Sequence, residues 1–172
     1  MFQTNNKIII KLISIYTITM SFLTLIMSAK VLFIKFNDLS SYNLTLIILI
    51  IYTMLLLVYT NINLLINKNQ IIFSYRFNIV VSFLQIFHFQ ILGITLHFIA
   101  MSDLSVYIIS NNNLDFKFFA SIYEGALELL YRRDLNGFFF GINFIPMFVY
   151  IMYLKSYKTY QKNINISKDI HL

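Results

Sequence analysis

Four long apolar runs, separated by polar segments, constrain the fold of this chain more than any other feature. They cover residues 12–34, 44–67, 77–100 and 138–154. A transmembrane helix needs about 20 predominantly apolar residues, so each run can cross a bilayer, the shortest one with help from its flanking residues. The sequence therefore predicts an all-α integral membrane protein in which residues 1–172 form one bundle of four transmembrane helices.

The composition favours lipid over water as the surroundings of this chain. Hydrophobic residues make up 59% and charged residues 12% of the sequence, whereas soluble domains carry about 25% charged residues. A water-soluble globule with this surplus would expose large apolar patches and aggregate. The net charge of +6 would suggest nucleic-acid binding in a soluble protein, but basic residues are also typical of cytoplasmic loops. We therefore expect the bilayer, and no nucleic acid, as a direct partner.

The basic residues predict the orientation of the helices. Cytoplasmic segments of membrane proteins are rich in Lys and Arg. Here the N-terminus, the second loop and the tail 155–172 are basic, while the first and third loops mix both signs. The basic set comprises Lys7, Lys11, Lys68, Arg76, Lys155, Lys158, Lys162 and Lys168. The sequence thus predicts a multi-pass protein of the cell (inner) membrane with both termini in the cytoplasm. The first run exceeds the length of a signal-peptide core, and no small-residue cleavage site follows it, so we interpret it as a retained helix.

The third loop, 101–137, is long enough to form structure outside the membrane. Two β-prone stretches, 105–110 and 114–119, flank three asparagines that tolerate turn geometry, which predicts a hairpin. Ser121 and Glu124 then fit a capping box, and 136–137 fits a helix stop, which predicts a short helix over 122–133. Glu124 and Glu128 are interpreted as part of the solvated face of this helix rather than as an acid/base pair.

Small residues indicate where the helices approach one another. Five hydroxyl residues of the first run fall within an arc of about 80° when the run is helical, and they are Ser14, Thr17, Ser21, Thr24 and Ser28. Gly137 and Gly141 form a small-xxx-small pair at the start of the fourth run. We expect both sets to be helix-packing faces; the alternative for the hydroxyls is the lining of a polar pathway. Pro146 predicts a kink in the fourth helix near Asn143, or alternatively a hinge.

The third run is the most polar of the four. One face of the predicted helix carries Asn78, Ser82, Gln85, His88 and Thr95, while Gln90 and His97 lie elsewhere around it. Buried amides and imidazoles are costly without a partner, so this face is expected to contact other helices or a second protein. We interpret His88 and Gln85 as a structural polar centre of the bundle; the alternative for His88 is a proton carrier or ligand.

No catalytic, metal or nucleotide motif is recognisable in the sequence, and cysteine is absent. We therefore expect no enzyme activity, no catalytic residue, no cofactor and no metal. The favoured hypothesis is a small accessory, regulatory or assembly subunit that acts through a protein partner or through a homo-oligomer within the membrane. An oligomeric pore-forming or membrane-disrupting effector, for example of a bacterial defence system, is the alternative. An intramembrane enzyme that uses His88 or His97 is the third hypothesis.

Overall fold

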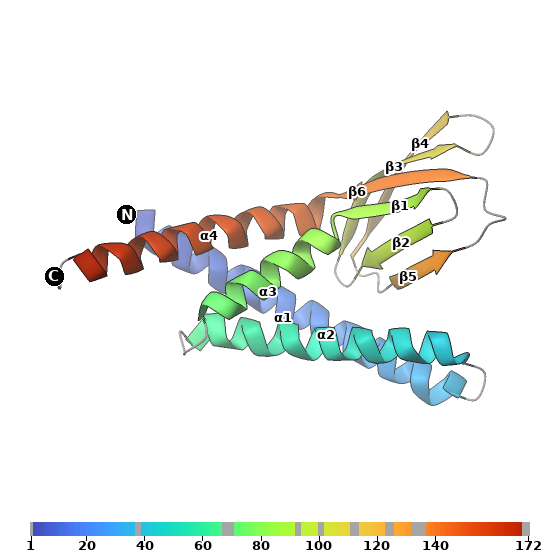
Figure 1. Ribbon diagram of the computed structural model, residues 1–172, viewed down its shortest axis with the longest axis horizontal. Coiled ribbons are helices and arrows are strands. Elements are labelled where there is room, and N and C mark those ends of the chain that lie inside the picture. The colour runs from blue at the N-terminus through green and yellow to red at the C-terminus, as the bar shows by residue number, and fades with distance from the viewer. Residues whose placement is uncertain are drawn as a thin grey trace.

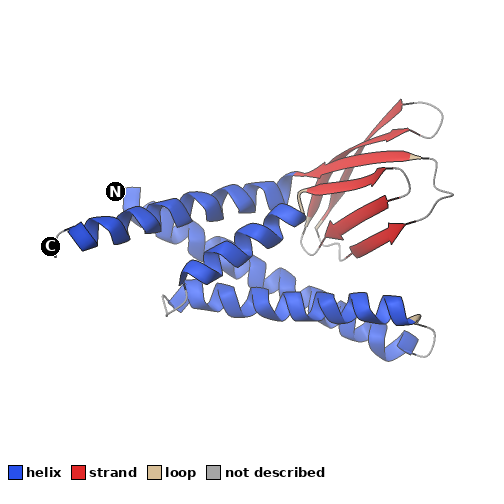
Figure 2. Cartoon of the chain, viewed as in Figure 1, coloured by secondary structure: helices blue, strands red, loops and turns tan. Residues whose placement is uncertain are grey.

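The computed structural model describes residues 2–36, 39–66, 71–91, 94–99, 102–110, 114–122, 126–131 and 137–169. These residues form four helices and six strands (Figures 1 and 2). The helices are α1 (Phe2–Lys35), α2 (Ser41–Ile66), α3 (Ile71–Leu84) and α4 (Phe144–Asp169). The strands are β1 (Phe87–Ile91), β2 (Ile94–Ile99), β3 (Asp103–Ser110), β4 (Leu114–Ser121), β5 (Ala126–Tyr131) and β6 (Phe138–Asn143).

The helices and the sheet occupy different parts of the molecule. Helices α1 and α2 form an antiparallel pair, α3 turns back along α2, and α4 returns from the sheet beside α3 (Figure 1). The N- and C-termini therefore lie at one end and the sheet at the other. All four helices contribute to a common core: Ile13 of α1, Leu64 of α2, Tyr75 of α3 and Tyr153 of α4 are buried together.

The predicted all-α bundle of four transmembrane helices is wrong. A six-stranded sheet, built from strands between residues 87 and 143, separates α3 from α4 along the chain. Among the described residues, two helices are long and apolar enough to cross a membrane, namely Lys7–Lys35 and Ser41–Ile66. These two helices support association with a membrane. The predicted span 77–100 is divided between α3, β1 and β2, and the predicted span 138–154 is divided between β6 and α4.

The third run fails as a helix because its pattern changes period at residue 85. The α3 helix closes with turn hydrogen bonds from Gln85 N to Ser82 O (3.2 Å) and from Ile86 N to Phe83 O (3.1 Å). From Phe87 onward, large apolar residues alternate with polar ones, as far as Phe98 and with a connection at 92–93. This period of two is typical of a half-buried strand, and the β1–β2 ladder follows it.

The six strands form one sheet in the order β4-β3-β6-β1-β2-β5, and all of its pairs are antiparallel. The predicted hairpin is confirmed, since β3 and β4 pair from Asp103↔Ser121 to Ser110↔Leu114. The predicted helix over 122–133 is wrong, because residues 126–131 form β5 and pair with β2. Its capping box and the stop at 136 fall partly outside the described residues.

The alternation of side chains gives the sheet two chemically different faces. Apart from Ser110, one face is apolar on five strands, and its large apolar residues are Phe87, Phe89, Ile91, Ile94, Leu96, Phe98, Leu104, Val106, Ile108, Leu114, Phe116, Phe118, Phe138, Phe140 and Ile142. The other face carries the polar and ionisable residues. Phe98 of the apolar face packs on Met54, Leu57 and Val81, which joins the sheet to α2 and α3. Much of the remaining apolar face is exposed: Phe116 and Phe118 are each 68% exposed.

Asn143 joins the sheet to the last helix. The position of Pro146 in the first turn of that helix shows that the prediction of a kink there is wrong. Its side-chain oxygen accepts hydrogen bonds from Ile145 N (3.1 Å) and Leu104 N (3.2 Å), so it caps α4 and holds β3 at once. Pro146 is the third residue of α4. A proline there removes no intrahelical hydrogen bond, because the first turn has no acceptor for its N–H. Neither a kink nor a hinge is needed.

Candidate functional site on the concave face of the sheet

The polar face of the sheet carries a row of residues that crosses all six strands. Its members, taken in strand order, are Lys117, Tyr107, Gly141, His88, His97 and Glu128. The ladders pair Lys117 with Tyr107, Tyr107 with Gly141, Gly141 with His88, and His97 with Glu128. The two histidines bridge β1 and β2, where their ring centres are 4.7 Å apart. Five of the six residues carry ionisable side chains, and they come from distant parts of the chain.

Gly141 is the one position in the row that requires a glycine. A Cβ built on it would overlap the ring of Tyr107. The absence of a side chain lets this ring lie across β6, where it stacks on Phe139 with ring centres 5.2 Å apart. It also approaches His88 edge-on at 6.1 Å. The predicted role of Gly137 and Gly141 as a helix-packing pair is therefore wrong: Gly141 lies in β6 and Gly137 directly precedes it.

His88 is the most deeply buried ionisable side chain among the described side chains of the row. It is fully buried, and its Nε2 lies 3.1 Å from the backbone oxygen of Gln85. Because a carbonyl oxygen only accepts, Nε2 carries the hydrogen in this contact, and Nδ1 keeps its lone pair. Nδ1 is buried and has no hydrogen-bond partner among the described residues.

A buried carboxylate lies beside the row. Asp103 is 1% exposed, and its two oxygens accept hydrogen bonds from Ser105 Oγ and from Tyr107 Oη, the latter at 3.0 Å. These bonds orient the Tyr107 ring toward the centre of the sheet. Both carboxyl oxygens of Asp103 thus accept hydrogen bonds from hydroxyl groups, and such bonds lower the free-energy cost of burying a polar group.

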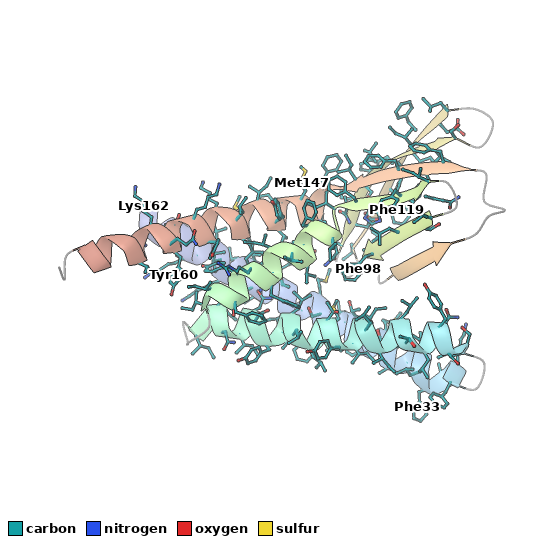
Figure 3. All side chains as sticks on the ribbon, in the orientation of Figure 1. Phe33, Phe98, Phe119, Met147, Tyr160 and Lys162 are labelled. Atoms are coloured by element: carbon teal, nitrogen blue, oxygen red, sulfur yellow. The ribbon has the colours of Figure 1, made fainter. Side chains whose placement is uncertain are left out.

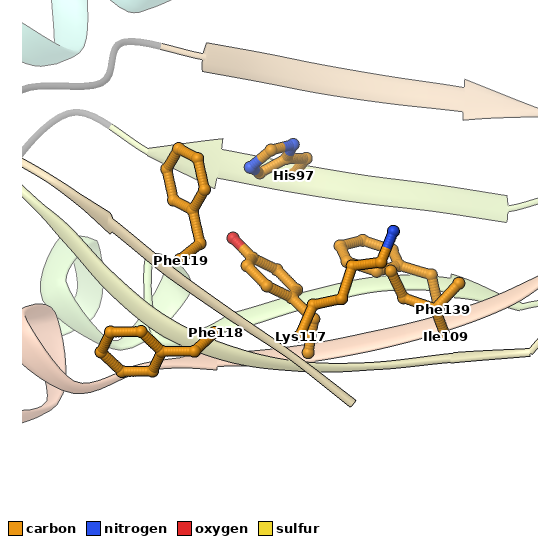
Figure 4. Close-up of a pocket in the computed structure, with 7 residues that line it drawn as sticks. His97, Ile109, Lys117, Phe118, Phe119 and Phe139 are labelled. Carbon is orange, nitrogen blue, oxygen red and sulfur yellow. The ribbon is translucent and has the colours of Figure 1, made fainter. Parts of the chain in front are cut away.

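A pocket of about 310 Å³ opens on this face (Figure 4). Its lining includes His97 of β2, Tyr107 and Ile109 of β3, Lys117 of β4 and Phe139 of β6. Strands β2 and β4 are separated by three other strands in the sheet, so the sheet must curve for both to line one pocket. The polar face is therefore concave, and we call it the concave face below. Figure 4 shows His97 and Lys117, which come from distant strands of the sheet, among the side chains that line the pocket.

A second polar cluster lies within the helices, far from the sheet residues of the row. Tyr153 Oη of α4 donates to Asn61 Oδ1 of α2 at 2.5 Å and lies 3.2 Å from Thr17 Oγ1 of α1. Asn61 Nδ2 donates to Asn78 Oδ1 of α3 at 2.6 Å, and Asn78 Nδ2 donates to Thr60 Oγ1 at 3.0 Å. All five residues are fully buried. This helix network joins the four helices through hydrogen bonds between buried side chains.

The structure distributes the predicted polar face over one helix, the turn that follows it and two strands. Asn78 and Ser82 lie on α3, Gln85 lies in the turn, and His88 and Thr95 lie on β1 and β2. All five are buried, but they do not share one helix face. The predicted hydroxyl face of α1 lies on a single helix, and its five members, Ser14, Thr17, Ser21, Thr24 and Ser28, are at most 9% exposed. Of these, Thr17 belongs to the helix network.

The sequence did not lead us to several residues that matter in the structure. Tyr107 and Lys117 were only part of a predicted hairpin, and Tyr153 was one tyrosine among twelve. The period-two pattern across 87–98 was the signal that would have placed His88 and His97 on one sheet face. For Tyr153 we find no signal in the sequence, since its partners lie 92 and 136 residues away.

The fold and its concave face define a membrane-associated protein with two long apolar helices and an antiparallel sheet. Comparison with protein-family models, with curated proteins and with solved structures finds no match for this chain.

Proposed function

We propose that the protein is a non-enzymatic assembly subunit of a membrane, which recognises its partner by strand addition at β4. The observation that carries this proposal is the open, apolar edge of the sheet at β4. Strand β4 pairs with β3 on one side only, and it ends the strand order of the sheet. Residues 114–120 are all exposed. A long edge strand with exposed apolar residues is a template for pairing with another strand.

The surroundings of this edge strengthen the proposal. Exposed aromatic residues Phe116 and Phe118 continue the apolar face of the sheet up to the edge. Figure 3 shows the same edge crowded with side chains that project away from the rest of the molecule. Unpaired backbone groups are not tolerated in hydrocarbon, so an edge that lies beside an apolar, lipid-compatible face requires a strand as its partner.

A second copy of this chain fits the edge by charge and by shape. Two β4 strands related by a two-fold axis through Phe116 would place Asp115 opposite Lys117 of the second copy, and Lys117 opposite Asp115. The same register places Phe116 opposite itself and Leu114 opposite Phe118, all on the apolar face. Opposite charges stabilise a cross-strand pair, and like charges destabilise it. An axis through Asp115 or through Lys117 would instead set like charges opposite each other.

The orientation in the membrane is part of this proposal. Lys7 and Lys11 lie on α1, and Lys155 and Lys158 lie on α4. The start of α1 and the end of α4 lie at the end of the molecule away from the sheet (Figure 1). Arg76 of α3 donates a hydrogen bond to Tyr157 of α4. Basic segments are retained on the cytoplasmic side, so we place the termini there.

Cysteine cross-linking tests strand addition directly, because the chain contains no cysteine. Residues opposite each other in an antiparallel pair have Cβ atoms about 4.5–5.5 Å apart, which is near disulfide range. Phe116→Cys should therefore form a covalent dimer under mild oxidation in native membranes. Phe118→Cys, which has the same exposure, is the matched control in β4, and Phe33→Cys, 94% exposed at the end of α1, is the control for random collision. Equal dimer yields from Phe116→Cys and Phe33→Cys would contradict the proposal.

A charge exchange tests the register. Lys117→Asp and Asp115→Lys should each lower the dimer yield of Phe116→Cys at least several-fold, because like charges then face each other. The double exchange should restore the yield, since the opposite charges are paired again. Failure of the double variant to recover, with both single variants folded, would exclude this register.

An oligomeric pore is the second candidate function, and the two faces of the sheet favour it. Sheets that line membrane pores turn apolar residues to lipid and polar residues inward. The strands have five to eight residues, however, whereas a membrane-spanning strand has about 9–11. Purified protein in liposomes separates the two functions: a pore releases a trapped fluorescent dye in proportion to protein density, and an assembly subunit leaves the vesicles intact.

A further inference from the structure

The exposed face of α4 changes from apolar to basic half-way along the helix. Its exposed residues recur at alternating spacings of four and three, so at 100° per residue they lie within an arc of about 80°. They are Phe144, Phe148 and Ile151 on the side of the sheet, and Lys155, Lys158 and Lys162 toward the C-terminus. We propose that this change marks the boundary between hydrocarbon and headgroups, and that the lysines bind the phosphates of anionic phospholipids.

Helix α3 brings a further cation and a group of tyrosines to the basic half of α4. Arg76 Nε donates a hydrogen bond to Tyr157 Oη at 3.1 Å. The ring of Tyr75 lies 5.9 Å from that of Tyr157 and 6.0 Å from that of Tyr160, measured between ring centres. Tyrosines are enriched where a membrane meets water, because the ring is apolar and the hydroxyl is polar. This level of the bundle is therefore suited to the headgroup region.

Helix α1 places a lysine at nearly the same level. Thr17 Oγ1 of α1 lies 3.2 Å from Tyr153 Oη of α4, and the two helices run in opposite directions there (Figure 1). At a rise of 1.5 Å per residue, Lys11 lies roughly 9 Å before Thr17 along α1, and Lys158 lies about 7.5 Å after Tyr153 along α4. Both lysines are exposed, so three helices direct cations to one level of the molecule.

The charge of this level favours an anionic partner that also has apolar chains. Residues 1–37, 39–102 and 135–168 contain no aspartate or glutamate, so these stretches carry no carboxylate of their own to neutralise the lysines and Arg76. Phosphates attract such cations, while Phe148 and Ile151 on the same helix face require an apolar neighbour. A phospholipid supplies both groups, whereas a nucleic acid or free phosphate supplies only the charge.

This inference concerns the end of the molecule away from the sheet, and it goes beyond strand addition at β4. It rests on the membrane association that the two long apolar helices support. The α4 variants described below change no residue of the sheet. They should leave the covalent dimer yield of Phe116→Cys unchanged, so the two proposals fail independently.

Lipid binding is measured on the full chain in an uncharged detergent, by native mass spectrometry and by the rise in melting temperature. Dioleoyl phosphatidylglycerol is the anionic probe, and dioleoyl phosphatidylcholine is the neutral one. The parent should bind the anionic lipid more tightly, and Lys155→Gln/Lys158→Gln should weaken that binding roughly tenfold. Lys155→Arg/Lys158→Arg keeps both charges and should bind as the parent does. Glycerol 3-phosphate, which lacks the acyl chains, should not compete.

Lys30→Gln/Lys35→Gln is the matched control for the loss of two positive charges. Both residues are exposed lysines of α1 near its other end, and this variant should keep the parent's affinity for the anionic lipid. An equal loss in the two glutamine variants would overturn the proposal, because net charge alone would then explain the binding. It is also overturned if the parent binds both lipids equally, or binds single-stranded RNA more tightly than phosphatidylglycerol.

Fluorescent labels locate the boundary itself, since the chain contains no cysteine. Phe148→Cys and Lys162→Cys lie on the same face of α4, roughly 21 Å apart along the helix. Each variant carries a polarity-sensitive fluorophore in vesicles of phosphatidylcholine and phosphatidylglycerol. The label at 148 should report hydrocarbon and resist iodide quenching, and the label at 162 should report water and be quenched. Equal quenching at the two positions would show that no boundary lies between them.

Discussion

Single residues decide how the sheet and the last helix meet. Asn143 is fully buried, and its amide group makes three hydrogen bonds: it accepts from Ile145 N and Leu104 N and donates to Ser102 O. Its backbone N–H bonds Ile86 O at 2.8 Å, which ties β6 to the turn after α3. One side chain thus provides hydrogen-bond partners for backbone groups at the start of α4, at the start of β3 and at Ser102, which directly precedes β3.

Replacing Asn143 with Ala should destabilise the protein more than an ordinary helix-cap substitution does. Loss of a cap costs about 0.5–2 kcal/mol, and a buried backbone group left unpaired adds about 1–3 kcal/mol. We expect a loss of about 2–4 kcal/mol in unfolding free energy, measured by denaturant titration in detergent. Asn43→Ala, at an exposed position in the first turn of α2, is the control and should change stability by less than about 0.5 kcal/mol. A loss as small as that at Asn143 would show that the cap is dispensable.

At the scale of elements, the helices join through polar groups that pack inside an apolar bundle. Tyr153 is central to this helix network, because its hydroxyl contacts both α1 and α2. Hydrogen bonds between helices in membranes average only about 0.6 kcal/mol each, so the network stabilises the bundle through the sum of several bonds. Removing one member also leaves its buried partner without a hydrogen bond, which is costly.

Tyr153→Phe should lower the thermal stability of the bundle while leaving the sheet intact. The change removes the bonds to Asn61 and Thr17 and leaves Asn61 Oδ1 without its Tyr153 donor, so we expect a loss of about 1–2 kcal/mol. Tyr150→Phe, one turn earlier on α4, removes a hydroxyl with no hydrogen bond among the described residues and serves as the control. Equal melting temperatures for the two variants, compared by scanning calorimetry or circular dichroism, would show that the network adds nothing.

The elements that the sequence predicted well are those whose pattern and surroundings agree. The first two apolar runs are helical, and the hairpin of β3 and β4 follows from its two β-prone stretches. The third and fourth runs were wrongly predicted as helices because the mean hydropathy of a window does not register alternation. Large apolar residues raise the mean hydropathy around Phe87-His88-Phe89 and Phe138–Asn143, although polar residues stand between or beside them. Residues 126–131 favour a helix locally, yet pairing with β2 makes them a strand. His88 and His97 are nine residues apart, which puts them on opposite sides of a helix but beside each other in a tight hairpin.

At the scale of the whole molecule, exposed apolar residues lie on both the long helices and the sheet. Exposed apolar residues follow α1 from Ile8 to Ile34 and α2 from Ile48 to Ile66, and the sheet continues them with Val106, Phe116 and Phe138. The charged residues of the described strand side chains, Asp103, Asp115 and Lys117, all lie on the concave face. The sheet therefore holds its charged groups on the concave face and its large apolar residues on the opposite face. This separation is expected of a sheet whose outer face contacts an apolar environment.

This arrangement predicts that the tip of the sheet and the C-terminus lie on opposite sides of the membrane. Helix α3 has 14 residues and β3 has eight, which correspond to roughly 21 Å of helix and about 26 Å of strand. Together they match a bilayer of about 40–45 Å including its headgroups. Single cysteines at Ser41, Asn112 and Ser167 in the cysteine-free chain are to be labelled with a membrane-impermeant maleimide on intact cells. We expect Ser41→Cys and Asn112→Cys to react from outside, and Ser167→Cys to react only after the membrane is opened. If Asn112→Cys instead behaves like Ser167→Cys, the sheet stays on the cytoplasmic side, and α1 and α2 alone cross the bilayer.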